Sequence, residues 1–187
     1  MSSTKSIRRV LTVIFAVSLL GLFFVYYALI LHKGIDACLK EEYFYVRLND
    51  GRKELFQNIE SKSDFITSIS LPLVVKLIRF SDQNVKNGRY QWTRPISALG
   101  FLRLIRSGQQ EPLNFVLFHG ESIEDMAGMA GRFFEQDSLS YLYYFLDPSI
   151  ARSYGYNSDD FLTMFIPNTY EMYWNTTPES FVKRMHR

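Results

Sequence analysis

Acidic side chains come first in the search for chemistry, because a placed carboxylate can act as a general acid or base. Glu121, Glu124 and Asp125 form one such cluster. They lie where a helix is expected to begin, and carboxylates are favoured at helix N-termini by capping and by the helix dipole. We therefore interpret the cluster as a helix cap and not as a catalytic group.

The sequence shows no pattern that is typical of a metal site or of a nucleophilic active site. His32, His119 and His186 are far apart in the sequence, and the chain has one cysteine. A zinc site needs several Cys or His ligands at close spacing, so no metal site is predicted. The sequence also contains no Gly-rich phosphate loop and no Gly-x-Ser-x-Gly elbow. Spacing alone indicates no active site.

An apolar segment near the N-terminus, residues 10–31, has 22 residues and no charge. As a helix it spans roughly 33 Å, close to the hydrocarbon thickness of a bilayer. Lys5, Arg8 and Arg9 precede it, so the positive-inside rule predicts a cytoplasmic tail at 1–9 and export of everything after the anchor. A cleaved signal peptide is the alternative, but its apolar region is shorter and ends at a small-residue cleavage site.

The charge balance after the anchor is nearly neutral. Of the 21 basic residues three precede the apolar segment, which leaves 18 basic residues against 19 acidic ones. This balance argues against nucleic acid or an anionic lipid surface as the main partner. About 155 residues follow the anchor, enough for one full domain or two small ones.

Periodic patterns in the first half of this part predict strand, helix, helix, strand and helix. For the second helix, at 71–80, Ser70 is the candidate N-cap and Pro72 the first helical residue, although a buried strand is an alternative. Its predicted apolar stripe is Leu73, Val74, Leu77 and Ile78. The other predicted elements are a strand at 42–49, a helix bearing Leu55, Phe56 and Ile59, a strand at 90–92 and a helix at 96–107 ended by Gly108.

The second half predicts a strand, a long amphipathic helix and a small helical layer packed by aromatic side chains. A capping box of Ser122 and Asp125 begins the long helix, in which Gly128 and Gly131 allow close approach of a neighbour. The predicted elements are a strand at 113–118, a turn at Gly120, helices at 123–135 and 148–154, helical segments at 138–146 and 158–164, and a helix from Pro178 capped by Thr177. The predicted fold class is α+β.

Three segments carry a resemblance to a known family. Phe165 to Glu171 reads FIPNTYE and resembles the F-P-D-T-Y signature of the MltG/YceG-like endolytic murein transglycosylases. VKNGRY at 85–90 and LRLIRSG at 102–108 resemble that family's turn and helix end. The resemblance implies a LysM-like module at 32–110 after the anchor, and the start of the YceG-like domain at 111–187.

The resemblance also implies an activity, cleavage of the MurNAc to GlcNAc bond inside glycan strands. One glutamate acts as general acid and then as general base on the muramyl 6-hydroxyl, which leaves 1,6-anhydro ends and needs no metal or cofactor. The implied location is the bacterial inner (plasma) membrane. The implied partners are peptidoglycan glycan strands, the lipid bilayer and cell-wall synthesis proteins, and no nucleic acid.

The family's catalytic glutamate lies downstream of its Pro-Asp-Thr-Tyr element, in motifs that do not occur between Tyr170 and Arg187. No residue of this chain is therefore assigned as catalytic, and neither Glu171 nor Glu179 is given that role. We expect a truncated product or fragment that ends before the catalytic part, with natural termination as the alternative. Residues 32–187 alone are expected to be inactive.

The resemblance places Asn168, Tyr170 and Tyr173 at a glycan groove, where they offer hydrogen bonds and stacking to sugar rings. The alternative is that Tyr170, Tyr173 and Trp174 are packing residues of a strand pair. For the whole chain, the alternative function is a non-catalytic, membrane-anchored glycan-binding or cell-wall scaffold protein.

Overall fold

The computed structural model describes residues 2–36, 38, 42–118 and 122–186, and the chain divides into two compact units. Unit 1 comprises Met1–Glu42, Gly51–Val85 and Trp92–Ser107, and unit 2 comprises Tyr43–Asp50, Lys86–Gln91 and Gly108–Arg187. Helices predominate, and unit 2 contains two small antiparallel sheets of two strands each. The mixed helix and strand class is thereby confirmed, whereas the domain bounds at 32–110 and 111–187 stay predictions.

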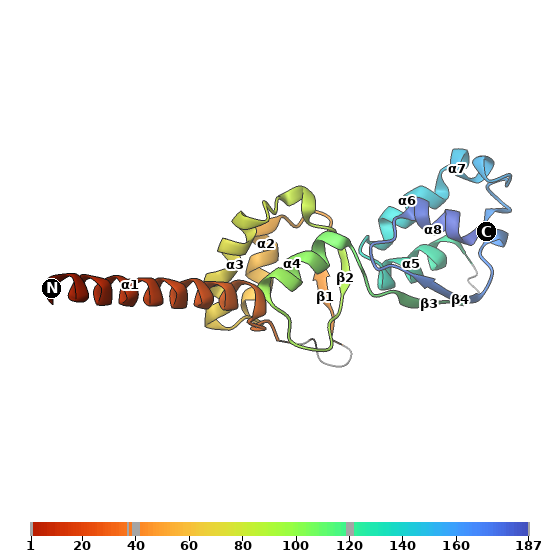
Figure 1. Ribbon diagram of the computed structural model, residues 1–187. Helices are drawn as coiled ribbons and strands as arrows, with labels where there is room; N and C mark the ends of the chain where they lie inside the picture. The colour runs from red at the N-terminus through yellow and green to blue at the C-terminus, as the bar shows by residue number, and fades with distance from the viewer. Residues whose placement is uncertain (1, 37, 39–41, 119–121, 187) are drawn as a thin grey trace. The chain divides into compact units, whose positions relative to one another are not determined.

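The elements follow one another along the chain as Figure 1 shows. The first part of the chain contains α1 (Ser2–Tyr26), η1 (Tyr27–Leu31), β1 (Phe44–Val46), α2 (Arg52–Glu60), α3 (Phe65–Leu77), η2 (Asp82–Asn84), β2 (Gly88–Tyr90) and α4 (Ala98–Ser107). The second contains β3 (Leu113–Leu117), α5 (Ile123–Phe133), α6 (Ser138–Leu146), α7 (Pro148–Ser153), η3 (Phe161–Met164), β4 (Asn168–Met172) and α8 (Pro178–Met185).

Helix α1 is long and apolar enough to cross a membrane from Ile7 to Tyr26, and none of that segment is buried within the protein. The π-helical turn η1 continues it to Leu31. A helix with apolar side chains on every side has no partner in water, because a water-soluble helix buries an apolar stripe and exposes a polar one. The predicted single N-terminal apolar helix is present.

Unit 1 packs its helices around a small apolar core. Ile35 is fully buried and pairs with Ser63 and Ile96 through isolated β-bridges. The indole nitrogen of Trp92 donates a hydrogen bond to the Asp36 carbonyl at 2.7 Å. Helix α4 ends at Gly108, whose φ of 70° lies in the left-handed region, as the sequence predicted. The remaining core includes Leu55, Ile59, Leu71, Val74, Phe80, Phe101, Leu102 and Ile105.

Helix α3 corrects one prediction. It begins at Phe65, and Asp64 caps it by accepting a hydrogen bond from the Thr67 backbone N–H at 2.8 Å. Ser70, the predicted cap, is buried inside the helix, and Pro72 is internal instead of first. The polar residues before Ser70 hid the true start. Packing of α3 against η1 and α4 is a tertiary effect that outweighs this local signal.

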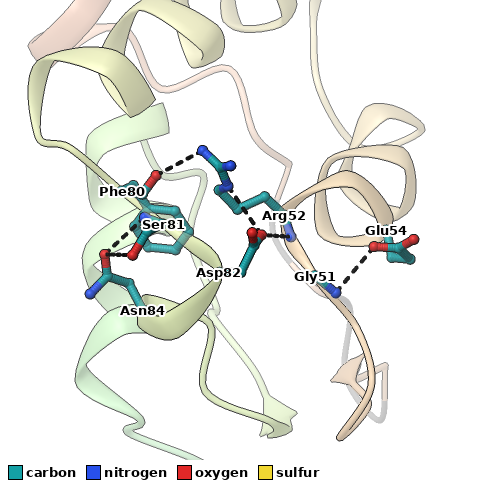
Figure 2. Close-up of polar contacts among 7 residues, drawn as sticks. All are labelled: Gly51, Arg52, Glu54, Phe80, Ser81, Asp82 and Asn84. Carbon is teal, nitrogen blue, oxygen red and sulfur yellow. Dashed lines mark hydrogen bonds and ion pairs between the residues drawn. The ribbon is translucent and has the colours of Figure 1, made fainter.

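The start of helix α2 is capped by Asp82, the first residue of η2, which lies 30 residues later in the chain (Figure 2). Gly51 precedes the helix, and its N–H donates to the Glu54 carboxylate at 3.1 Å. Glycine has no side chain to complete a capping box, and Asp82 takes that place. Its carboxylate accepts from the Arg52 backbone N–H at 2.9 Å and from the Arg52 Nε at 3.1 Å. These hydrogen bonds lower the pKa of Asp82.

Unit 2 places helices over one face of the sheet formed by β3 and β4 (Figure 1). The pairing aligns Leu113 with Met172 and Phe115 with Tyr170. Phe115 is fully buried and meets aromatic rings from α8 and from the end of α5, and rings of α6 join the same core, so the predicted aromatic packing is confirmed. The aromatic members of this core are Phe115, Phe134, Tyr141, Phe145, Phe161, Phe165 and Phe181.

Most local signals in unit 2 act as predicted. The capping box forms between Ser122 and Asp125, with hydrogen bonds of 3.1 and 3.2 Å. A Cβ atom on Gly131 would lie 2.4 Å from the Ser138 backbone, so glycine is required for that approach, whereas Gly128 has no such neighbour. Thr177 caps α8. Strand β2 lies at 88–90, earlier than the predicted 90–92, because it pairs with β1 in a register that aligns Phe44 with Tyr90.

Candidate functional site

The predicted groove residues Asn168, Tyr170 and Tyr173 lie on or just after β4. Tyr170 packs against the aromatic core, and its hydroxyl donates to the Ile166 carbonyl at 2.8 Å. Tyr173 is exposed and lies just after the end of β4. Asn168 is exposed, and its Oδ1 accepts from the Thr169 N–H at 2.7 Å. The three side chains do not converge on one cavity, and their role in glycan binding stays a prediction.

Trp174, the residue after Tyr173, lines two surface depressions of unit 2. We call them together the Trp174 site. The first has a volume of about 440 Å³ and is lined by Tyr43, Tyr45, Arg89, Pro112, Leu113, Asn114, Arg132, Phe133 and Trp174. The second has a volume of about 630 Å³ and is lined by Arg47, Leu48, Asn49, Asp50, Glu135, Gln136 and Trp174.

Aromatic rings and guanidinium groups shape the first depression. The rings of Tyr45 and Trp174 meet edge to face, with centroids 4.9 Å apart. The guanidinium carbon of Arg89 lies 4.0 Å from the centre of the Tyr43 ring, a cation–π contact that keeps both side chains in place. Arg89 also donates to the backbone carbonyls of Glu111 and Pro112. The charged and aromatic lining is therefore pre-organised.

Glu135 holds the second depression together. Its carboxylate accepts hydrogen bonds from the Leu48 backbone N–H and from the Asn87 side-chain amide, the latter at 3.2 Å. Its own backbone N–H donates to the Trp174 carbonyl at 2.9 Å. One residue thus joins the loop after β1, the turn before β2 and the end of β4. We interpret Glu135 as a positioning residue, because both carboxylate oxygens already accept hydrogen bonds from the protein.

The segment after Trp174 is fixed from beneath by Tyr141. This buried side chain donates its hydroxyl to the Thr176 carbonyl at 2.5 Å. Burial raises the pKa of Tyr141, with a smaller contribution from the charge of Glu135, so the hydroxyl stays a donor at neutral pH. Asn175 donates to the Asn87 carbonyl at 3.0 Å. The backbone that carries Trp174 is held on both sides.

The Trp174 site can bind a ligand that presents both apolar ring faces and acidic groups. Aromatic rings stack on the C–H faces of sugars, and guanidinium groups pair with carboxylates.

Among the described residues no cluster of three or more metal-ligating side chains occurs. The acidic residues named in the sequence analysis that the structure describes lie elsewhere in the chain and not in the lining of the Trp174 site. Asp125 caps α5, Glu124, Glu171 and Glu179 are exposed, and Glu121, Gly120 and His119 lie outside the described residues.

Sequence reasoning missed most of the Trp174 site. Tyr43 and Tyr45 alternate with the buried residues Phe44 and Val46, so strand periodicity alone placed both tyrosines on one face. Nothing in the sequence joined that face to Trp174, which lies about 130 residues later. Trp174 itself was considered only as a packing residue. Arg132 and Glu135, at and beyond the end of α5, carried no local signal.

Comparison with known proteins identifies one family. The model of the YceG-like family matches residues 44–187, which include both sheets and every residue of the Trp174 site except Tyr43. No curated protein and no solved structure gives a significant match to the chain.

Proposed function

Because the chain belongs to the YceG-like family, the family of MltG endolytic transglycosylases, we propose that it binds peptidoglycan glycan strands as the membrane-anchored part of such an enzyme. The family match suggests a function related to murein transglycosylation. The particular reaction proposed is cleavage of the MurNAc to GlcNAc bond with formation of 1,6-anhydro-muramyl ends.

The Trp174 site is the observation that carries glycan binding. Tyr45 and Trp174 present aromatic surface at a depression whose lining includes Arg89 and Arg132. Peptidoglycan combines sugar rings with carboxylates on its peptide stems, which suits an aromatic and cationic lining. Tyr173 and Asn168 remain candidates for contacts beyond the depression.

The chemical step is proposed without a residue of this chain. A single glutamate would protonate the leaving oxygen and then deprotonate the muramyl 6-hydroxyl, and the resemblance places that glutamate beyond the FIPNTY segment at 165–170. Glu135 is not proposed for this role, because its carboxylate accepts hydrogen bonds from Leu48 and Asn87. Residues 44–187, which the family model matches, would bind the glycan strand and position it for cleavage.

The proposed organisation follows the chain. Residues 1–9 form a cytoplasmic tail, residues 10–31 the anchor, residues 32–110 a LysM-like module and residues 111–187 the start of the YceG-like domain. Two strands that pair across two intervening helices, in the order β1, α2, α3 and β2, support the LysM-like assignment. Helix α1 has the length and composition of a membrane span and supports the anchor.

Binding to purified murein sacculi tests the proposal. Full-length protein in detergent is sedimented with sacculi, and Trp174→Ala is expected to bind roughly fivefold more weakly, since a stacked ring contributes on the order of 1 kcal/mol. Tyr143→Ala is the matched control, because Tyr143 is an exposed aromatic residue of the same unit that does not line the Trp174 site. Tyr173→Ala tests the candidate from the sequence.

Equal binding by Trp174→Ala and the parent, with unchanged thermal stability, would contradict the assignment of this site. The same sacculi are then analysed for anhydro-ended products. We expect no such products from residues 32–187 alone, and their appearance would show that the catalytic group lies within this chain.

A further inference from the structure

Helix α3 exposes four large apolar side chains. Its buried residues are Thr67, Ser70, Leu71 and Val74, of which the two polar ones are 1% and 3% exposed. A water-soluble helix usually exposes polar side chains on the face that is not buried. The outer side chains recur every four residues and so form one stripe along the helix. This stripe consists of Phe65, Ile69, Leu73 and Leu77, which are 79%, 56%, 54% and 68% exposed.

The α3 stripe is continuous with the anchor. Helix α3 packs against η1, and Figure 1 shows it beside the end of α1 within unit 1. A depression of about 350 Å³ lies between the two, with a lining that is apolar except for Ser70. The lining comes from both helices and comprises Phe24, Val25, Phe65, Ile66, Ile69, Ser70 and Leu73. Whatever surrounds Phe24 and Val25 therefore also reaches the stripe.

Polar contacts fix α3 to the segment that follows the anchor. The Asp64 N–H donates to the Gly34 carbonyl at 2.8 Å, and the Asp64 carboxylate lies 2.5 Å from Nε2 of His32. A Cβ atom on Gly34 would lie 2.1 Å from the Asp64 carboxylate, so only glycine permits this approach. The orientation of the α3 stripe is thus set by the fold.

The depth of the contact fits the edge of a bilayer. Phe24 lies seven residues before Leu31, which corresponds to about 10 Å along a helix. Interfacial helices bury their apolar face roughly 5–10 Å deep at the boundary between head groups and acyl chains. Between Phe65 and Leu77 the sequence has one charged residue, Lys76, whose long side chain can extend toward head groups.

We infer that α3 lies in the interface of the bilayer that α1 enters, with the α3 stripe against the acyl chains of the exported side. The inference rests on the proposed anchoring of the chain. The occupant of the stripe is lipid because the stripe adjoins Phe24 and Val25 of the anchor and because its side chains are apolar along the whole helix. Unit 1 is then held against the membrane by two elements, one that crosses it and one that lies in it.

Depth-dependent quenching tests the inference on the full chain. With Cys38→Ser as background, an environment-sensitive fluorophore is attached through Leu73→Cys, through Asn58→Cys at an exposed position of α2, or through Leu19→Cys in α1. The protein is reconstituted into vesicles of phosphatidylethanolamine and phosphatidylglycerol that carry quenchers at shallow or deep acyl positions. We expect the label at 73 to lose most of its fluorescence to shallow quenchers and the label at 58 to keep it.

The three labels separate the possible failures. Quenching at position 19 by deep quenchers without quenching at position 73 would overturn the inference and leave the anchor standing. Absence of quenching at both positions would overturn the anchor and the inference together. A label at position 73 that is shielded from aqueous iodide but not quenched by lipid would show that protein covers the stripe, which also overturns the inference.

Discussion

At the scale of single residues, Phe181 contacts five aromatic rings in the core of unit 2. It is fully buried on α8, and its partners come from β3, α6, the end of α5 and the end of η3. Edge-to-face and tilted pairs of this kind add to the free energy gained from burial alone. Its ring partners are Phe115, Phe134, Tyr141, Phe145 and Phe165, with centroid separations between 5.5 and 6.1 Å.

Phe181→Ala is expected to lower the free energy of unfolding by about 3–5 kcal/mol, because truncation leaves a cavity among rings that cannot collapse together. Urea unfolding followed by near-ultraviolet circular dichroism measures the change. Tyr143→Ala serves as the control, since its exposed ring lies on α6 outside the core and its loss is expected to change stability by less than about 0.5 kcal/mol. Similar losses in both variants would contradict this account.

At the scale of elements, the capping of α2 by Asp82 shows that a residue far along the chain can act as the cap of a helix. The carboxylate and the helix start are 30 residues apart, and the ion pair with Arg52 reinforces the hydrogen bond to its N–H. Because these contacts favour the charged carboxylate, the pKa of Asp82 is lower in the folded chain than in the unfolded one. A depressed carboxyl pKa stabilises the fold above its ordinary value near 3.8, and that stabilisation is lost as the pH falls through the folded value.

Asp82→Asn is therefore expected to lower the melting temperature at pH 7 and to have a progressively smaller effect as the pH falls below 3.8 and through the lower folded pKa, where the folded parent also loses the charge. Melting curves recorded by circular dichroism across this pH range measure the difference in melting temperature between parent and variant. Glu60→Gln, an exposed carboxyl at the end of the same helix, is the control. A gap of constant size at all pH values would show that Asp82 acts through its shape and not through its charge.

At the scale of the whole molecule, the proposed anchor would determine on which side of a membrane residues 32–187 lie. Basic residues precede α1 without an acidic partner, and such asymmetry favours retention of that end in the cytoplasm. The α3 stripe would add a second membrane contact on the exported side. Both proposals place the Trp174 site in the compartment that contains peptidoglycan.

A topology reporter measures this orientation. Alkaline phosphatase fused after Arg187 is expected to be active in intact bacterial cells, because the enzyme folds only when exported. Removal of residues 2–31 from the same fusion is expected to abolish activity, and replacement of Lys5, Arg8 and Arg9 by glutamate is expected to reduce it. Full activity of the truncated fusion would contradict the role of the anchor.

Local signals predicted much of the fold because they act within one helical turn or one strand. The capping box of Ser122 and Asp125, the left-handed Gly108 and the cap of Thr177 each involve residues at most four positions from the element they begin or end. The start of α3 was predicted wrongly, because packing against η1 and α4 selects a start that polar residues before Ser70 concealed. The bounds of β2 depended on pairing with β1.

The sequence by itself determined the apolar span, most helix ends, the α+β class and, through the FIPNTY segment at 165–170, the resemblance to the family. Each of these depends on composition or on neighbours along the chain. The tertiary structure alone decided that Tyr45 meets Trp174 and that Arg89 lines the same depression, that Asp82 caps α2 and that α3 directs its apolar stripe outward. These features join residues tens of positions apart, and such contacts follow from packing and strand register, which no local periodicity encodes.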